Sequence, residues 1–542
     1  MNDIDDYDGE GERTPLQEAM DAINALCDAF DIPALTHIIG KSLHRLEMAE
    51  AEILCDFVKV KTGMSTTAAR ALLRGAKCYR EGHGTLQTPR QVANAYLSLL
   101  DSDYGQVVFT GSSLYVYEDV MVPPDDEIEG SADEGFFERV PFDALEKDLV
   151  ETFDDLPLLR SSAGRKEVLS QLRLMRGQDD FFVDARAGVN LKNGFLHLDG
   201  DGQLHLLQHA PEHKARLRLE AAYDSAANFN WLETAFARTL PDPAARLALQ
   251  EVAGSILFGI KPARDNVRGM FLLWGASGSG KSTIIEMLVR LLPPEVVGSV
   301  PPEHWNDPIF RASLENLLLN VVTELGGTVR IRGDQMKKIV SGEPTTGRRM
   351  RNDPFSFTPV AKHLFATNEL PRILDKTDAF ARRILVLHFP ETLVGDQVDT
   401  GFIDKVDADP NALIAFAAAG AARLIRQGAF TTPASHHLAI AEMQYGNDPA
   451  ELFAHTQVEQ APGCRITTIE LRSALKTFYD ERGFEQSSIN DQTIAKVVGV
   501  LQNKCGATRH KSNGQPFYKG VALTRADRPR DDGAFQVDLN DL

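Results

Sequence analysis

The stretch MFLLWGASGSGKSTIIEMLVRLL, residues 270–292, decides the fold. It begins with an apolar run typical of a strand, continues through a glycine-rich segment and ends in a run that suits a helix. Its middle fits the pattern G-x-x-x-x-G-K-[ST], in which backbone N–H groups and the positive end of a helix bind phosphate. Strand, loop and helix in this order are what the motif requires. The stretch therefore predicts a phosphate-binding loop, and the apolar segments that follow it predict an α/β domain with a largely parallel sheet.

The residues of this loop are the expected contacts of a nucleotide. They are Gly275, Ala276, Ser277, Gly278, Ser279, Gly280, Lys281, Ser282 and Thr283. In such loops the lysine reaches the β- and γ-phosphates, and the hydroxyl that follows it holds Mg²⁺. ATP and Mg²⁺ are therefore the expected cofactors. A fortuitous glycine-rich turn is the alternative interpretation.

Two later strands end in side chains that suit ATP hydrolysis. LLLNVV (317–322) is apolar, as a buried strand is, and Glu324 follows it, 43 residues after Lys281. We expect Glu324 to polarise the attacking water and to lie near the metal ion, although Thr323 replaces the usual aspartate before it. HLFAT (363–367) leads to Asn368, a candidate sensor between the γ-phosphate and the water. A solvated strand end and a plain turn residue are the alternatives for these two side chains.

Two adjacent arginines precede the next apolar strand, ILVLHF (384–389). Arg382 and Arg383 suit an arginine finger, which stabilises transition-state charge on the ATP of a neighbouring subunit. Arg383 is the first choice and Arg382 the second. The other arginine of the pair is expected to make a structural ion pair.

Composition limits the class of protein. The chain has 542 residues, 43% hydrophobic and 25% charged, which suits three or four globular domains. No apolar run approaches the roughly 18–20 residues that span a bilayer. The acidic start is neither a secretory signal nor a transit peptide, and the five cysteines are scattered, as in reduced thiols of a cytoplasmic protein. The net charge of −20 speaks against nucleic-acid binding over the whole surface, but not against a local basic site.

The order of these motifs resembles the superfamily 3 helicases of the AAA+ class, and more closely the phage/plasmid primase-helicase family that includes the poxvirus primase-helicase. The residues that carry the resemblance are 275–283, 317–325, 337–371 and 378–389, together with the region of about 95–260. The resemblance implies a ring, expected to be a hexamer, that moves 3′→5′ along single-stranded or forked DNA in phage or plasmid replication. It also implies Glu324 as the catalytic acid, Asn368 as the sensor and Arg383, or Arg382, as the finger.

The resemblance and the sequence texture together suggest domain boundaries. We expect an acidic flexible tail (1–15), a helical N-terminal domain (16–92), a helicase-associated α+β domain (93–260), the AAA+ ATPase domain (261–395), a helical lid or linker (396–445), a winged-helix domain (446–524) and a flexible acidic tail (525–542). In the associated domain, residues 107–122 and 188–207 are expected to form strands, the latter a hairpin with Gly200-Asp201-Gly202 in its turn.

A basic segment predicts where DNA would bind. Between residues 330 and 351 there are seven basic and two acidic residues, a local charge of +5 in an acidic chain. The expected contacts are Lys337, Lys338, Arg348, Arg349 and Arg351. The last three would lie near the tip of a hairpin over residues 344–355 that faces the channel of the related helicases. Lys496, Lys504, Arg509 and Lys511 of the winged helix are further candidates for phosphate contact. A solvated loop or subunit-interface ion pairs are the alternatives for the hairpin, and protein docking is the alternative for the winged helix.

A primase site is not evident in the sequence. Asp199-Gly200-Asp201 is the one near match to paired metal-binding aspartates, and it falls in an expected turn. We therefore expect a helicase that acts with a separately encoded primase or replication protein, and no membrane partner. One alternative is an ATP-dependent DNA-binding initiator, loader or defence ring that does not unwind processively. Another is a non-enzymatic scaffold with a silent phosphate loop.

Overall fold

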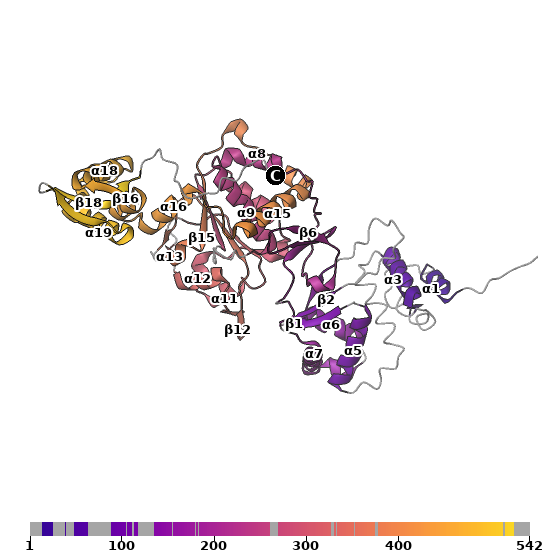
Figure 1. Cartoon of the computed structure of the whole chain (residues 1–542). Helices are drawn as coiled ribbons and strands as arrows, with labels where there is room; N and C mark the ends of the chain where they lie inside the picture. The colour runs from indigo at the N-terminus through magenta and orange to yellow at the C-terminus, as the bar shows by residue number, and fades with distance from the viewer. Residues whose placement is uncertain are drawn as a thin grey trace, which may run out of the picture. The chain divides into compact units, whose positions relative to one another are not determined.

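The computed structural model describes the chain in several ranges. They are residues 14–24, 38–39, 48–62, 88–103, 106–110, 113–117, 135–153, 156–178, 180–182, 184–260, 269–326, 330–331, 333–351, 353–373, 378–512 and 515–524. Contacts divide the chain into two compact units (Figure 1). The first contains Met1–His197 and Leu206–Glu220, and the second contains Leu198–His205 and Ala221–Leu542.

The first unit is a mixture of helices and short antiparallel strands. Its elements are α1 (Pro15–Asn24), α3 (Met48–Thr62), α5 (Pro89–Asp103), β1 (Gln106–Thr110), β2 (Ser113–Tyr117), β3 (Phe137–Pro141), α6 (Phe142–Thr152), α7 (Ser162–Arg176), β4 (Gly188–Leu191), β5 (Gly194–Leu198) and β6 (Leu204–Leu207), the last of which continues from the second unit. Strands β1, β2 and β3 form one antiparallel sheet and β4, β5 and β6 another. The strands expected in 107–122 and 188–207 are confirmed for the described residues, whereas residues 111–112 and 118–122 lie outside them. The sequence also predicts a helix at 66–77, which lies outside the described residues.

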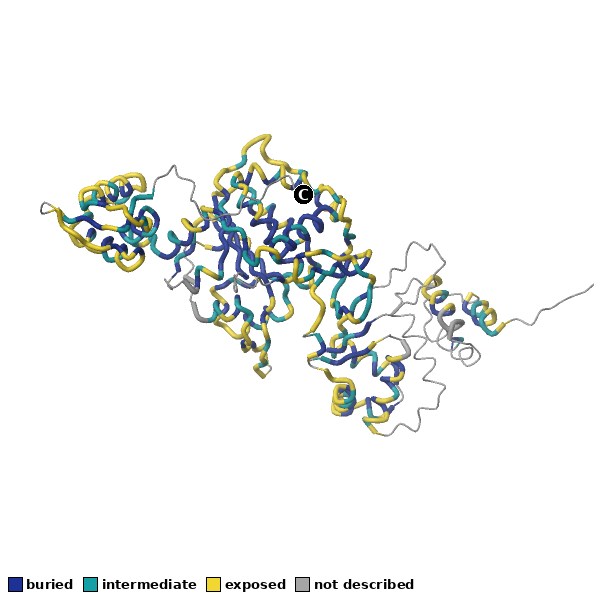
Figure 2. The backbone as a smooth tube through the Cα atoms, viewed as in Figure 1, coloured by how far each residue is buried: buried dark blue, intermediate teal, exposed yellow. Residues whose placement is uncertain are grey.

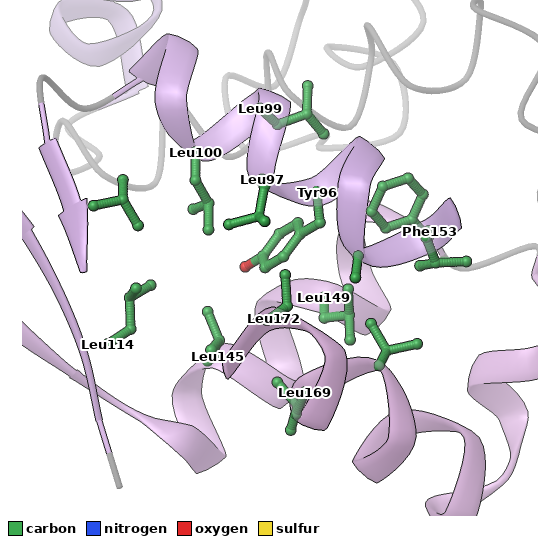
Figure 3. Close-up of a cluster of buried hydrophobic side chains, with 14 of the residues drawn as sticks. Tyr96, Leu97, Leu99, Leu100, Leu114, Leu145, Leu149, Phe153, Leu169 and Leu172 are labelled. Carbon is green, nitrogen blue, oxygen red and sulfur yellow. The ribbon is translucent and has the colours of Figure 1, made fainter. Parts of the chain in front are cut away.

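One apolar core holds α5, α6 and α7 against β1 and β2 (Figure 3). Tyr96 of α5 lies at its centre with no exposed surface, and its ring meets Phe153 edge to face at 6.1 Å. Its hydroxyl donates a hydrogen bond to the carboxylate of Asp148 on α6, so the polar end of this buried ring is satisfied.

The Asp199-Gly200-Asp201 segment is a turn, as expected. The Asp199 carboxylate accepts hydrogen bonds from the backbone N–H groups of Asp201 (3.0 Å) and Gln203 (2.8 Å), the usual role of aspartate in a tight turn. These bonds, led by the one from Gln203, hold the pKa of Asp199 below its usual range, and His205 adds to the effect. The carboxylate is therefore engaged in shaping the chain.

The second unit is built on one parallel sheet. Its strands are β7 (Met270–Gly275), β8 (Val297–Gly298), β9 (Leu319–Val322), β13 (Lys362–Thr367) and β15 (Ile384–Phe389), in the spatial order β15-β7-β13-β9-β8. Every neighbouring pair is parallel. The expectation of an α/β domain with a parallel sheet is confirmed. Strands β7, β9, β13 and β15 are almost wholly buried (Figure 2), which explains their continuous apolar runs.

Helices and small sheets complete this unit. They are α8 (Asn230–Thr239), α9 (Pro243–Phe258), α10 (Lys281–Val289), α11 (Pro308–Ala312), β10 (Arg330–Ile331), α12 (Gly333–Ser341), β11 (Thr345–Arg348), β12 (Pro354–Phe357), β14 (Arg372–Ile373), α13 (Asp378–Ala381), α14 (Phe402–Ala408), α15 (Pro410–Gln427) and α16 (Ala434–Tyr445). Helices α9 and α15 pack along each other (Figure 1). Glu251 of α9 is fully buried between them, and its carboxylate accepts hydrogen bonds from Arg423 (2.8 Å) and the Thr431 hydroxyl (2.7 Å). The buried charge is therefore paired.

Polar groups also lie inside the sheet. The Asn320 amide on β9 donates hydrogen bonds to the Val300 carbonyl (3.0 Å) and to Nδ1 of His363 on β13 (3.2 Å). His363 has no exposed surface, and its Nε2 has no hydrogen-bond partner among the described residues. Burial, with a smaller effect of the Lys362 charge, lowers the pKa of His363 from 6.5 to about 3. The folded protein therefore keeps this imidazole neutral in mildly acidic solution.

We expect His363 to make the fold sensitive to acid. Between pH 6.5 and 3 the side chain is protonated in the unfolded chain but not in the folded chain. The stability that the neutral His363 contributes is therefore fully present above pH 6.5 and falls as the pH is lowered. The contribution is about 1.4 kcal/mol per pH unit in that range. In urea unfolding at pH 7.5, 6 and 5, His363→Leu should lose stability less steeply than the wild-type chain. Parallel pH profiles of the two proteins would contradict this assignment.

The C-terminal part differs from its prediction in one strand. Its elements are α17 (Pro449–Thr456), β16 (Val458–Thr467), α18 (Thr468–Glu481), α19 (Asp491–Cys505), β17 (Thr508–Ser512) and β18 (Gln515–Leu523). The sequence predicts two helices followed by a two-stranded ribbon within residues 446–524, and these elements are present as α18, α19 and β17–β18. However, β16 adds a third strand to the sheet, in the order β16-β18-β17. Ala461, Pro462 and Gly463 lie within β16, and an edge strand tolerates them because its register against β18 shifts between Gln460 and Arg465.

Candidate nucleotide-binding site

The glycine-rich loop joins β7 to α10 at the carboxyl end of the sheet. Gly278 and Gly280 have φ angles of 76° and 90°, a left-handed backbone that other residues rarely adopt. Gly275 lies so close to β15 that a Cβ atom there would be 2.1 Å from the Phe389 carbonyl oxygen. The segment after β15 also holds the loop, because the Leu393 N–H donates to the Gly278 carbonyl (3.0 Å). The glycines are therefore needed for the shape of the loop.

Lys281 is folded onto this loop. Its ammonium group donates hydrogen bonds to the carbonyls of Gly275 and Ala276, both at 2.7 Å, and to the Ser279 hydroxyl at 3.2 Å. The side chain is buried, and burial lowers the pKa of Lys281. Among the described residues no carboxylate pairs with it. A buried cation without a charged partner, set in a loop at the start of a helix, is suited to an anion such as phosphate.

Glu324 and Asn368 lie at the same edge of the sheet as the loop. Strand β13 lies between β9 and β7, with Phe365 paired to Val322 on one side and to Leu272 on the other. Glu324 follows β9 and Asn368 follows β13, and both side chains are exposed. Since parallel strands are about 4.8 Å apart, the β9 and β7 strand ends are roughly 10 Å apart, with the β13 end between them. The three predicted elements are thus brought to one edge.

Hydrogen bonds fix these strand ends. The Leu325 N–H donates to the Ala366 carbonyl (2.8 Å), and the buried Thr367 hydroxyl bonds to the Leu325 carbonyl (2.9 Å). The chain on either side of Glu324 is therefore tied to β13. The backbone that carries Glu324 is thus held beside the end of β13, while its carboxylate is exposed.

The two arginines lie at the opposite edge of the sheet. They immediately precede β15, whose Ile384 pairs with Met270 and whose Phe389 pairs with Gly275. Six and seven residue steps of about 3.3 Å place Arg383 and Arg382 about 20 Å or more from the glycine-rich loop along the strands. Arg382 is exposed, whereas Arg383 is half-buried and its Nε donates to the Ser341 hydroxyl (3.0 Å). The sequence analysis ranked Arg383 above Arg382 as the finger, whereas the structure gives Arg383 a partner in its own chain and leaves Arg382 exposed.

The basic segment forms the expected hairpin. Strands β11 and β12 pair antiparallel, with Arg348 opposite Pro354 and exposed residues at the tip. Arg349 pairs with Glu315, and its guanidinium lies 4.7 Å from the centre of the Phe355 ring. Arg351 is exposed at the tip with a left-handed φ of 62°. Because Arg349 contacts its own chain, Arg351 at the exposed tip becomes the principal candidate for contact with a ligand.

The other predicted basic contacts have different surroundings. On α12, Lys338 is exposed and Lys337 is half-buried. Lys496 of α19 lies in ion pairs with Asp448 and Glu451 at the start of α17, and Lys504 donates to the His455 carbonyl (3.0 Å). Of the four C-terminal candidates, Arg509 and Lys511 lie on β17, whose residues are all exposed.

A cavity beside the loop had no sequence motif to reveal it. It has a volume of about 650 Å³ and is lined by residues of α8, of the first turns of α10 and of segment 393–409. Residues such as Trp231 and Asp399 are far apart in sequence and meet here through the fold. The one available signal was aromatic enrichment in α8, which is equally typical of a core helix.

Comparison with known proteins gives limited matches. Residues 273–383 match DUF5906, a family of unknown function. Among solved structures, the chain is similar to an A-form apo structure of the NrS-1 C-terminal region, with a TM-score of 0.39, 11% identity and coverage of 80% of this chain and 98% of that one. A second apo structure of the NrS-1 C-terminal region, residues 305–718, matches with a TM-score of 0.38 and 12% identity, and the match covers 80% of this chain and 100% of that one. Within the described ranges, no helix has both the length and the apolar character to cross a membrane.

Proposed function

We propose that this protein is an ATP-driven DNA helicase that works as a ring. The observation that carries this proposal is that the ends of strands β7, β9 and β13 lie side by side. The Lys281 loop, Glu324 and Asn368 lie at one edge of a parallel sheet. This arrangement suits binding of the triphosphate by the loop, activation of water by Glu324 and sensing of the γ-phosphate by Asn368. Hydrolysis of a phosphoanhydride requires mainly such positioning and charge stabilisation.

Mg²⁺ fits the donors at this edge. The Ser282 hydroxyl is exposed at the start of α10, and the Glu324 carboxylate is exposed after β9. Oxygen donors of this kind suit a hard cation that keeps several waters and binds substrate phosphates. When bound, the ion would neutralise charge on the phosphates.

The remote arginines support a ring. A side chain about 20 Å away along the strands is not placed to serve the loop of its own chain. It can serve the loop of a neighbour, and a heterologous contact of this kind that repeats from subunit to subunit forms a ring when its rotation closes. We propose a hexamer with 3′→5′ movement, as the sequence resemblance implies.

The hairpin supports nucleic acid as the track. Its exposed tip carries Arg348 and Arg351 in a chain whose net charge is −20. Since backbone phosphates dominate affinity for nucleic acid, a local basic element is sufficient to hold a strand without reading its sequence. Phage- or plasmid-type replication is the proposed setting.

Stimulation of ATP hydrolysis by single-stranded DNA tests this function. We expect DNA to raise the turnover of the wild-type chain and a forked duplex to be unwound. The double variant Arg348→Gln, Arg351→Asn should bind single-stranded DNA about tenfold more weakly or worse, because phosphate contacts are lost. Its DNA-free hydrolysis should be unchanged. Asparagine at 351 tolerates the left-handed φ there.

A matched control removes a basic charge elsewhere. Lys147→Ala deletes an exposed lysine of α6 and should leave DNA stimulation intact. Hydrolysis that is indifferent to DNA would overturn the nucleic-acid track. Stimulation by DNA without unwinding of the fork would favour the alternative of an initiator, loader or defence ring.

A further inference from the structure

The cavity beside the glycine-rich loop is a second feature of the nucleotide site. It is continuous with the loop, because Gly280, Thr283 and Ile284 form part of its wall. Its volume of about 650 Å³ lies within the range of small-molecule sites, about 300–1,000 Å³. A ligand whose phosphates lie on the loop and the first turn of α10 would therefore extend into this space.

An aromatic group forms the apolar wall. Trp231 and Phe236 come from α8 and Phe402 begins α14, and the ring centre of Phe402 lies 5.9 Å from that of Trp231 and 6.0 Å from that of Phe236. Both phenylalanines are buried, whereas Trp231 is half-buried. Phe402 thus packs near the indole of Trp231, and the half-buried Trp231 offers an apolar aromatic surface to the cavity that it lines.

Charged groups form the polar wall. Asp399 accepts a hydrogen bond from the Lys405 ammonium (2.7 Å), and Arg238 of α8 faces the same cavity. Lys405, with a smaller contribution from Arg238, holds the pKa of Asp399 below its usual range. The carboxylate is therefore ionised at neutral pH and is able to accept hydrogen bonds from hydroxyl or amino groups. An apolar flat wall with a few convergent polar groups is typical of a site for a polar planar molecule.

We propose that this cavity binds the nucleoside half of the nucleotide, with the base against Trp231 and the ribose hydroxyls or base amino group directed to Asp399. The proposal rests on the proposed ATPase function and adds the part of the site that recognises more than phosphate. It makes α8 and segment 393–409 the two walls of the site. Neither belongs to the motifs from which the phosphate site was predicted.

Filling the cavity tests the proposal. Ala235 is a half-buried residue of α8 that lines it, and leucine there would occupy space that the nucleoside needs. Binding of Mg-ATP and of Mg-tripolyphosphate is measured by calorimetry, because tripolyphosphate engages the loop but has no nucleoside. Ala235→Leu should bind ATP at least tenfold more weakly and tripolyphosphate as the wild type does. Ala237→Leu is the matched control, since Ala237 lies two residues along the same helix, is exposed and does not line the cavity.

Each outcome of these binding measurements either supports or overturns the proposed nucleoside site. Wild-type affinity of Ala235→Leu for ATP, or equal weakening of both compounds, would overturn the proposal. If Ala235→Leu does not fold, Trp231→Ala takes its place, with the same selective loss of ATP affinity expected and with unchanged ATP affinity overturning the proposal. Failure of the wild-type protein to bind either compound would overturn the proposed ATPase function itself. Binding of tripolyphosphate without preference for ATP would overturn the nucleoside site alone.

Discussion

Replacement of Lys281 by alanine is expected to lower ATP hydrolysis by roughly 1,000-fold or more, since removal of even one preorganised charge-stabilising donor commonly costs 100- to 1,000-fold. Lys281 is the one cation of the glycine-rich loop, and its burial without a carboxylate partner among the described residues means that phosphate would supply its counter-charge. The measurement is phosphate release at saturating ATP. ATP affinity should fall together with turnover.

The fold of this variant must be checked separately. Lys281 also satisfies the carbonyls of Gly275 and Ala276, and a buried acceptor left without a donor costs about 1–3 kcal/mol. Lys281→Met keeps the aliphatic stem and serves as a second variant, with thermal unfolding of both compared with the wild type. Hydrolysis at the wild-type rate by a folded variant would show that the activity does not come from this loop.

Replacement of Arg382 by alanine is expected to lower turnover by about 1,000-fold or more while ATP affinity is kept, as for loss of an arginine finger. Arg382 is exposed and lies at the edge of the sheet opposite the loop, so in the proposed ring Arg382, and not the first choice Arg383, is placed to act across a subunit boundary. Arg383→Ala is the matched control. Because Arg383 already bonds Ser341 of its own chain, its loss should chiefly reduce stability, by about 1 kcal/mol.

Mixing the two inactive variants, Arg382→Ala and Lys281→Ala, provides a second test of whether Arg382 acts on a neighbouring subunit. In a ring that contains both Arg382→Ala and Lys281→Ala chains, some interfaces combine an intact loop from the first with an intact arginine from the second. Activity should therefore return on mixing, measured as phosphate release by the mixture against each variant alone. If mixing restores nothing while the chains exchange between rings, or if Arg383→Ala is the variant that loses turnover at full stability, the assignment to Arg382 is wrong.

The sequence predicted the phosphate loop and the parallel sheet because both depend on local signals. The glycines at 278 and 280 belong to a motif whose backbone conformation is known to need glycine. The apolar runs before Gly275, Glu324 and Asn368 are long enough to indicate buried strands. Their meeting at one edge follows from a parallel sheet, in which carboxyl ends lie together. The hairpin of Arg348 and Arg351 also follows from its local pattern.

Other features depend on contacts between distant residues. The different surroundings of Arg382 and Arg383 are set by Ser341, about forty residues earlier, which no local pattern indicates. Lys496 resembled a surface cation until Asp448 and Glu451 of α17 were placed beside it. Strand β16 was missed because Pro462 and Gly463 are typical of a turn, and its pairing with β18 outweighs that preference.

The opposed edges of the sheet have a consequence for how the protein would behave in a test tube. An ATPase that takes its loop from one chain and its arginine from another has no complete catalytic centre in an isolated chain. Its rate per chain would then fall on dilution as assemblies come apart, and would rise again on any scaffold that gathers chains together. A long DNA strand is such a scaffold, so idle chains would consume little ATP until they are collected on it.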